Sequence, residues 1–337
     1  MNKTGNRVVA FLVILGILMV GSVAFAKDVL TLSIGHVVTE EGGEHLGSMK
    51  FAELLDKKSG GTIKLRIFPN GQVGQNREMV ESLQAGALDM ALPALPALGG
   101  FTEATKVFDL FYLFDDRFQA EKVLDGSVGQ DVAAAMESSG IKIISWWTQG
   151  FRETTANREL RKPEDLKGLK IRVMENPLHI EAWNMLGASA IPMAFSEVLT
   201  SLQQGVLDAQ ENPYQNIVHS GFHTVQKYII ETSHLYGPLP VAFSKVNWEK
   251  LTPDQQKIIL EAAEETKVWQ REKQEEINKG LKETIEKTGS NVIISLSAEE
   301  KAAFRKNLQP LYKKYAPQMN GYVERIYEEL GRAVDFK

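Results

Sequence analysis

An internal repeat constrains the fold of this chain more than any other feature of its 337 residues. Residues 78–89 (EMVESLQAGALD) align without a gap with residues 197–208 (EVLTSLQQGVLD), and seven of the twelve positions are identical. Glycine often ends a helix because it adopts the left-handed conformation easily, which accounts for Gly86 and Gly205. It does not account for the matching Glu, Ser, Leu, Gln and Asp. The repeat therefore predicts two related lobes.

The segments around the repeat predict an α/β fold. Apolar alternation and helical spacing indicate a strand at 30–34, a helix at 44–59, a strand at 63–67, a helix at 75–84 and a strand at 88–92. Each copy of the repeat follows a strand that ends in proline, at Pro69 and Pro192. Alternating strands and helices are typical of α/β domains with crossover helices. Two such lobes enclose a cleft, and open α/β sheets bind ligands at the carboxyl ends of their strands.

A long helix is predicted near the C-terminus. Thr252, Pro253 and Gln255 combine an N-cap residue, a proline at the first helical position and a glutamine at the third. The helical pattern that they open runs to about Lys287. A helix of some 35 residues is roughly 50 Å long. We expect it to brace both lobes.

The N-terminus carries the pattern of a secretory signal peptide. Lys3 and Arg7 precede thirteen apolar residues, 8–20, and a small-x-small cleavage site ends at Ala26. An uncleaved anchor is the alternative, since residues 8–26 are uncharged and approach the roughly 20 residues that span a bilayer. We expect cleavage after Ala26 and export to the periplasm. Loss of the two basic residues changes the formal charge from −5 to −7.

Composition excludes several classes of function. Thirty-eight basic residues against forty-three acidic residues leave no excess positive charge for a phosphate backbone, so no nucleic-acid partner is expected. The absence of cysteine excludes thiol nucleophiles, Cys-based zinc sites, iron–sulfur clusters and lipoprotein acylation. The mature chain is therefore expected to be a free protein.

The sequence shows no catalytic or metal-binding constellation. It contains no G-x-S-x-G elbow, H-E-x-x-H motif, phosphate-binding glycine loop or EF-hand loop. His219 and His223 have the i, i+4 spacing of metal ligands, but no third ligand lies near them, so ordinary histidines are favoured. We expect no enzyme activity, no cofactor and no metal site.

Two arginines lie among apolar or strand-forming residues. Arg152 follows the segment from Trp146 to Phe151, and Arg172 lies between Ile171 and Val173 in a predicted strand. A guanidinium in a covered strand stays protonated and needs an anionic partner. That partner is either a protein carboxylate, in a buried ion pair, or a ligand carboxylate, in a bidentate contact. The spacing alone leaves both interpretations open.

The chain resembles the solute-binding proteins of tripartite ATP-independent periplasmic (TRAP) transporters over essentially its whole mature length. The order and spacing of several motifs together carry this resemblance. They are SGGTIKLRIFPNGQVG (59–74), QAGALDM (84–90), DLKGLKIRVM (165–174), LGA (186–188), PMAFSEV (192–198) and DAQENP (208–213).

The resemblance implies a two-lobed clamshell like that of periplasmic binding proteins. Each lobe has a mixed β-sheet flanked by helices, a long helix braces both lobes, and the protein closes on an organic acid. The implied boundaries are 1–26 for the signal peptide, 27–149 with about 238–277 for lobe I, and 150–237 with about 278–337 for lobe II.

The resemblance also implies roles for individual residues. Arg172 aligns with the arginine that binds the ligand carboxylate, and Arg152 with a second ligand-facing arginine. Asn212 matches a polar residue that reaches the carboxylate, and Phe195 an apolar wall beside it. Further candidates for hydroxyl contacts or ring stacking, each of which packing or surface exposure would explain equally well, are Glu78, Trp147, Tyr214, Tyr236, His36 and His45.

The implied ligand is a small carboxylate. Members that bind sialic acid have an acidic residue just after the strand equivalent to 88–92, where this chain reads Pro93-Ala94-Leu95-Pro96. Aldonates, uronates and C4-dicarboxylates are therefore the expected ligands, with sugar acids slightly favoured.

The predicted function is that of a monomeric extracytoplasmic receptor. It would deliver its ligand to the small and large membrane subunits of a TRAP permease. A secreted α/β enzyme acting on an acidic sugar is one alternative, and a sensor module that presents a ligand to a membrane protein is another.

Overall fold

The computed structural model describes residues 29–334 and 336. The predicted signal peptide and its cleavage site after Ala26 lie outside the described residues. Among the helices described, none is both long and apolar enough to cross a membrane.

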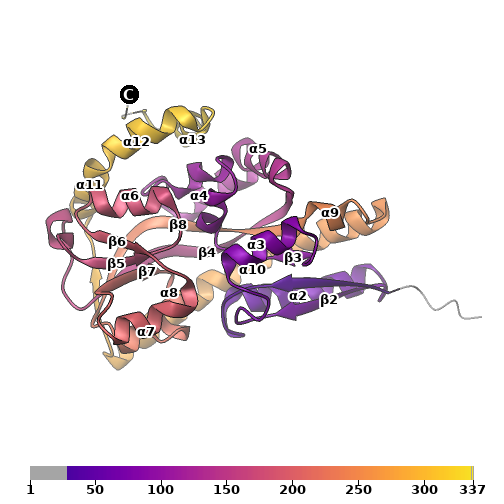
Figure 1. Cartoon of the computed structure of the whole chain (residues 1–337), viewed down its shortest axis with the longest axis horizontal. Coiled ribbons are helices and arrows are strands. Elements are labelled where there is room, and N and C mark those ends of the chain that lie inside the picture. The colour runs from indigo at the N-terminus through magenta and orange to yellow at the C-terminus, as the bar shows by residue number, and fades with distance from the viewer. Residues whose placement is uncertain (1–28, 335, 337) are drawn as a thin grey trace, which may run out of the picture.

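One mixed sheet runs through the molecule (Figure 1). Its strand order is β2-β1-β3-β8-β4-β7-β5-β6, and β9 pairs with β8. The strands are β1 (Leu30–Gly35), β2 (Ile63–Phe68), β3 (Met90–Ala91), β4 (Ile141–Ala156), β5 (Lys170–Val173), β6 (Ser189–Pro192), β7 (Ala209–Asn212), β8 (Tyr228–Ser244) and β9 (Val292–Ser295).

Helices flank this sheet. They are α2 (Gly43–Lys58), α3 (Asn76–Gln84), α4 (Arg117–Asp125), α5 (Ser127–Ala135), α6 (Pro177–Met185), α7 (Val198–Gln203), α8 (Tyr214–His219), α9 (Lys245–Trp248), α10 (Pro253–Thr288), α11 (Ala298–Asn307), α12 (Gln309–Tyr315) and α13 (Tyr322–Glu329). Short 3-10 helices include η1 (Leu95–Gly100), η2 (Ala104–Asp109) and η5 (Phe195–Glu197). The predicted α/β fold with a long bracing helix is confirmed.

Two long strands join the lobes. β4 and β8 pair antiparallel from Ile141 opposite Ser244 to Ala156 opposite Tyr228. The parallel strands β1, β2 and β3 extend the sheet on one side, and β5, β6 and β7 extend it on the other. The pairing shifts register at three places, and one of them, between Thr148 and Gly150, lies beside the predicted lobe boundary.

The C-terminal helices contact both lobes. Lys314 of α12 lies 2.6 Å from Glu181 of α6, while Arg325 of α13 lies 2.7 Å from Asp131 of α5. In Figure 1 these helices extend from α6 towards α5 along one edge of the molecule. Assignment of residues from about 278 to 337 to lobe II remains a prediction.

The sequence repeat corresponds to a structural repeat. Its two copies form most of α3 and all of α7, and each copy ends one residue before the next strand, β3 or β7. Gly86 and Gly205 end the two helical segments at φ of 71° and 69°. Each copy thus turns from helix to strand through the same left-handed residue.

The repeated aspartates have equivalent partners. Asp89 accepts a hydrogen bond from the backbone N–H of Ser33 in β1, at 2.9 Å. Asp208 accepts one from the backbone N–H of Lys170 in β5, also at 2.9 Å. In each lobe the carboxylate therefore fixes the start of one strand, β3 or β7, against its parallel neighbour, β1 or β5. This shared role explains why the aspartate recurs.

Helix α10 has the predicted ends. The Thr252 hydroxyl accepts from the Gln255 N–H at 3.3 Å, and the Gln255 side chain accepts from the Thr252 N–H at 2.9 Å. Gly289 ends the helix in the left-handed conformation, at φ of 62°. The helix contains 36 residues, which agrees with the sequence prediction.

Polar side chains of α10 bind β4 where its pairing with β8 is irregular. The Gln270 amide donates to the Thr148 carbonyl at 2.8 Å and accepts from the Thr148 N–H at 3.0 Å. Asn278 donates to the Gln149 carbonyl at 3.0 Å. The helix thus satisfies backbone groups that this stretch of the sheet leaves unpaired.

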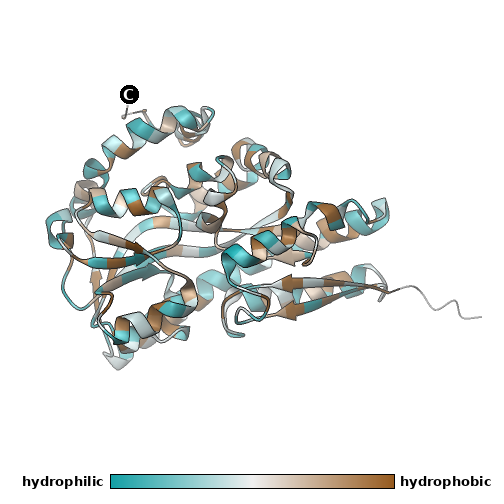
Figure 2. Cartoon of the chain, viewed as in Figure 1, coloured by the Kyte–Doolittle hydropathy of each residue, from teal (hydrophilic) through white to brown (hydrophobic). Residues whose placement is uncertain are grey.

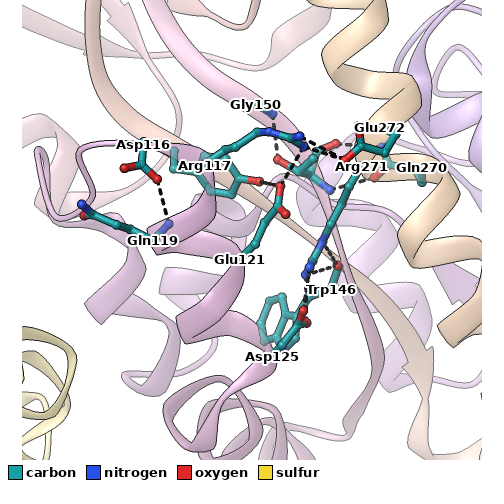
Figure 3. Close-up of polar contacts among 12 residues, drawn as sticks. Asp116, Arg117, Gln119, Glu121, Asp125, Trp146, Gly150, Gln270, Arg271 and Glu272 are labelled. Carbon is teal, nitrogen blue, oxygen red and sulfur yellow. Dashed lines mark hydrogen bonds and ion pairs between the residues drawn. The ribbon is translucent and has the colours of Figure 1, made fainter. Parts of the chain in front are cut away.

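Arg271 fixes the same helix to the first lobe. Its guanidinium donates to the carboxylate of Asp125 in α4, at 2.7 Å and 3.0 Å, and to the carbonyl of Trp146 in β4, at 2.9 Å (Figure 3). Nearby, Arg117 of α4 donates to Glu272 at 3.0 Å. These contacts hold α4, β4 and α10 together.

Buried apolar side chains form two large clusters. The ribbons of the helices carry both hydrophilic and hydrophobic residues (Figure 2). One cluster lies under α2 and α10 and includes Phe51, Leu55, Trp147 and Ile259. A larger cluster extends from the first lobe to α6 and the C-terminal helices. The two lobes therefore share part of their core.

Gly150→Ala is expected to lower the free energy of unfolding by about 1–3 kcal/mol. Gly150 has φ of 81°, and an added Cβ would lie 2.6 Å from Nδ2 of Asn278, which binds the neighbouring carbonyl. Gly280→Ala in α10 is the matched control, because an added Cβ meets open space there. It should stabilise the protein by about 0.5–1 kcal/mol. Urea denaturation measures both free energies of unfolding. Equal changes in the two variants would contradict the predicted strain at Gly150.

Candidate binding site

A pocket lies between the lobes at the carboxyl ends of parallel strands. It encloses about 490 Å³ of empty space, including its open mouth. The first lobe contributes residues at the start of α3 and in η1, and the second lobe contributes residues that end β5 or follow β6. The lining residues are Gln75, Asn76, Arg77, Ala97, Gly100, Arg172, Met174, Glu175, Met193, Ala194 and Phe195.

Arg172 provides a buried positive charge in this pocket. Its exposed fraction is 3%, and Nε and Nη2 both donate to the carbonyl of Met193, at 2.9 Å and 2.7 Å. Within residues 29–334 and 336, no carboxylate lies within ion-pair distance of this guanidinium. Burial lowers the pKa of Arg172 to about 10, although the charge of Glu211 opposes the shift. The protein thus leaves this cation without a direct anionic partner.

Arg152 has a carboxylate partner within the protein. Its Nε and Nη2 lie 2.5 Å and 2.9 Å from the carboxylate oxygens of Glu211, and both side chains are buried. Burial raises the pKa of Glu211, but Arg152 and His234 more than offset this, so the pKa lies well below its usual value. Of the two interpretations left open by the sequence, Arg152 forms a buried ion pair.

Asn212 belongs to this network, whereas Phe195 lines the pocket. Asn212 accepts from Nη2 of Arg152 at 3.1 Å and donates to Gln210 at 2.6 Å. Gln210 is the register partner of Arg172, so Asn212 lies on the neighbouring strand. Phe195 forms part of the pocket wall and meets the ring of Phe222 edge-on, with centroids 5.7 Å apart.

Glu78 lies beside the pocket. Its carboxylate accepts from the backbone N–H of Gln75 at 2.7 Å and so caps α3. Gln75 itself lines the pocket. The structure therefore gives Glu78 a helix-capping contact, and a ligand contact remains a prediction.

The remaining candidates lie outside the described lining of this pocket. Trp147 is fully buried under α2, where its ring meets Phe51 edge-on. The hydroxyl of Tyr214 donates to Glu231 at 2.9 Å, and that of Tyr236 to Glu121 at 3.4 Å. The ring contact of Trp147 and the hydrogen bonds of the two tyrosines account for their burial without a ligand.

His36 and His45 contact one another. Nε2 of His36 lies 3.2 Å from Nδ1 of His45. Burial, with a smaller contribution from His45, lowers the pKa of His36 to about 4. In the described part of the chain no group of three potential metal ligands forms, and His219 and His223 belong to no such group.

Sequence reasoning named Glu78 of α3 but missed the pocket residues at the start of this helix. Gln75, Asn76 and Arg77 follow the turn after β2 and line the pocket from the first lobe. The rule that helices begin at the carboxyl edge of a parallel sheet was the available signal. Glu175 was also missed, although it follows Arg172 by only three residues.

A buried polar contact joins the lobes behind the pocket wall. Asn176 caps α6 and donates to the Asp109 carboxylate at 2.8 Å and to the Pro96 carbonyl at 3.0 Å. Burial raises the pKa of Asp109 to about 7, although the bond from Asn176 opposes this shift. Its other oxygen lies 3.7 Å from Nε2 of His179.

Comparison with known proteins identifies the family. The sequence model of "Bacterial extracellular solute-binding protein, family 7" (DctP) matches residues 34–318. The chain belongs to this family. The resemblance to TRAP solute-binding proteins is thereby confirmed, and the family consists of extracytoplasmic solute receptors.

Two relatives are named as binding proteins for different acids. The 2,3-diketo-L-gulonate-binding periplasmic protein YiaO of Escherichia coli is 33% identical over 307 residues, covering 88% of this chain and 92% of the relative. The C4-dicarboxylate-binding protein DctB of Bacillus subtilis is 34% identical over 292 residues, covering 86% and 83%.

A solved structure shares the fold. The sugar acid binding protein DctPAm from Advenella mimigardefordensis strain DPN7T, in complex with galactonate, matches with a TM-score of 0.86 and 29% sequence identity. The match covers 89% of this chain and 97% of that one.

Glu211→Gln is expected to destabilise the protein by about 3–5 kcal/mol, because it leaves Arg152 buried without its counter-ion. The matched control is Glu197→Gln, which changes an exposed glutamate in η5 and should alter stability by less than about 0.5 kcal/mol. Urea denaturation at neutral pH measures both. A loss for Glu211→Gln no larger than the control's would show that the ion pair is not structural.

Asp109→Asn is expected to stabilise the protein increasingly as pH rises from about 4 to about 7. In the unfolded chain Asp109 ionises near the ordinary aspartate pKa of 3.8, whereas the folded protein retains the proton up to about pH 7. The free energy of unfolding of the wild type therefore falls as the pH rises through this window, by at most about 1.4 kcal/mol per pH unit for one group. Urea denaturation of the variant and the wild type at several pH values in this range measures the difference in their free energies of unfolding. A difference that does not change with pH would contradict the prediction.

Proposed function

We propose that this protein is the extracytoplasmic receptor of a TRAP transporter and captures a small organic acid between its two lobes. The observation that carries this proposal is the environment of Arg172. Its guanidinium has 3% exposure, lines the pocket and, within the part of the chain that the structure describes, donates only to the carbonyl of Met193. A ligand carboxylate would supply the missing counter-charge through charge-assisted hydrogen bonds.

The ligand class follows from this contact together with the relatives. The ligands that their names give are 2,3-diketo-L-gulonate, C4-dicarboxylate and galactonate, and all carry a carboxylate. We therefore propose that this receptor binds a sugar acid or a dicarboxylate with one carboxylate on Arg172. Phe195 and Met193 would cover the apolar parts of the ligand.

Closure of the lobes is the proposed signal to the transporter. A ligand shifts a conformational equilibrium only when it binds one state better than the other. The pocket takes residues from both lobes, so a ligand that spans it would favour the closed state. The proposed partners are the small and large membrane subunits of a TRAP permease.

The receptor would be a monomer in the periplasm, released from its signal peptide after Ala26. It would release its ligand chemically unchanged, without enzyme activity. Turnover of a bound sugar acid during prolonged incubation would contradict this part of the proposal.

A thermal-shift screen against organic and sugar acids should identify the ligand. A ligand that binds only the folded state raises the Tm, and a concentration of 100 times the Kd gives about 2.7 kcal/mol of stabilisation. We expect hits among aldonates, uronates or C4-dicarboxylates. The absence of any shift across such a library would argue against the receptor function.

Arg172→Gln is expected to weaken binding of the best ligand about 10-fold to 100-fold, as loss of a charge-assisted hydrogen bond requires. Titration calorimetry measures the affinity. The Tm of the unliganded variant separates lost binding from lost folding. Arg66→Gln is the control, because Arg66 is an exposed arginine on β2 outside the pocket. Unchanged affinity in Arg172→Gln would remove the basis of the proposal.

A further inference from the structure

The charged groups around the pocket do not contribute equally. Arg77 lines the pocket from the first lobe, but its Nε lies 3.1 Å from a carboxylate oxygen of Glu81, one helical turn away. The guanidinium of Arg77 also lies 5.5 Å from the centre of the Phe101 ring. The charge of Arg77 is therefore compensated within its own helix.

The start of α3 is compensated as well. A helix N-terminus carries a partial positive charge that attracts anions. Here the Glu78 carboxylate, in the first turn, accepts from the Gln75 N–H at 2.7 Å. The first-lobe side of the pocket thus offers amide groups for hydroxyl oxygens, but little net positive charge for a carboxylate.

Glu175 places a negative charge on the second-lobe side. It follows Arg172 by three residues, lines the same pocket and is exposed to solvent. Among the described residues no side chain forms an ion pair or hydrogen bond with its carboxylate. The charge of Glu175 acts on Arg172 through space. The pocket therefore holds one uncompensated cation and one unpartnered anion.

We propose that Glu175 is a specificity-determining residue that makes this pocket select hydroxylated monocarboxylates over dicarboxylates. The inference rests on the proposed function, in which Arg172 holds one ligand carboxylate. With that carboxylate in place, the rest of the ligand would extend into a pocket that Glu175, Gln75 and Asn76 line.

The chemistry of a carboxylate explains both halves of the selection. An ionised carboxylate only accepts hydrogen bonds, and its two oxygens bind neighbouring hydroxyl groups of a sugar acid. A second ligand carboxylate has no proton to donate and meets a like charge instead, which is unfavourable. The side-chain amides of Gln75 and Asn76 bind hydroxyl groups without this preference.

Matched pairs of acids test the inference. Galactonate and galactarate share a carbon skeleton and differ in whether the far end is a hydroxymethyl group or a carboxylate, and erythronate and meso-tartrate form a shorter pair. Titration calorimetry on the mature wild-type protein should give tighter binding of the monocarboxylate in the pair that fits. We define the Kd ratio as the Kd of the dicarboxylate divided by the Kd of the monocarboxylate. In Glu175→Gln this ratio should fall about threefold to tenfold, because the variant lacks a partly solvated like charge.

Glu197→Gln provides a matched control for this experiment. Glu197 also acts through space on Arg172, but it does not line the pocket. Its replacement removes the same charge at a site that the ligand does not touch, so the Kd ratio should stay within about twofold of wild type. A general electrostatic effect on Arg172 would change both variants alike and would overturn the specific role of Glu175.

The outcomes separate this inference from the proposed function. Tighter binding of the dicarboxylates by the wild type, or an unchanged Kd ratio in Glu175→Gln, would overturn the inference and leave the receptor function intact. If no acid of either kind binds, or if Arg172→Gln binds as well as wild type, the proposed function fails together with the inference. A lower ratio in Glu175→Gln alone, with binding still dependent on Arg172, supports both.

Discussion

The two lobes depend on one pair of strands that they share. β4 and β8 run through both lobes, and each lobe adds its own parallel strands to them. Relative movement of the lobes must therefore bend this pair. The pairing shifts register between Ile143 and Ser145, between Thr148 and Gly150, and between Arg152 and Thr154, and irregular pairing permits a local bend. Gln270 and Asn278 of α10 bind the carbonyls of Thr148 and Gln149, so the long helix supports β4 at the middle one of these shifts.

The second lobe contains two buried arginines, and they differ in whether a protein carboxylate pairs with them. Arg152 has its counter-ion in Glu211, and this pair completes the interior of the lobe. Arg172 lies on β5 and, among the described residues, its guanidinium donates only to the carbonyl of Met193. Burial of a cation without an anion is unfavourable, and a ligand carboxylate would relieve that cost. The buried cation lies at the carboxyl end of β5, where the proposed ligand would bind.

Most of the fold could be predicted because its signals are local. The start of α10 follows from the capping residues Thr252 and Gln255, and the repeat predicted the recurrence of helix, glycine and strand. The candidate site was only partly predictable. Arg172 stood out as a charge inside a strand, but its partner could not be known, because Arg152 had the same appearance in the sequence. Trp147, Tyr214 and Tyr236 looked equally available, and packing accounts for their burial.

The sequence by itself determined the α/β class, the two related lobes and the family, since periodicity, capping residues and ordered motifs are written along the chain. Tertiary structure decided which charges are compensated. Arg152 and Glu211 are 59 positions apart and meet only because β4 pairs with β7. Gln75 and Glu175 line one pocket because two lobes bring the ends of separate strands together. Electrostatic balance depends on distance in space, which local sequence does not contain.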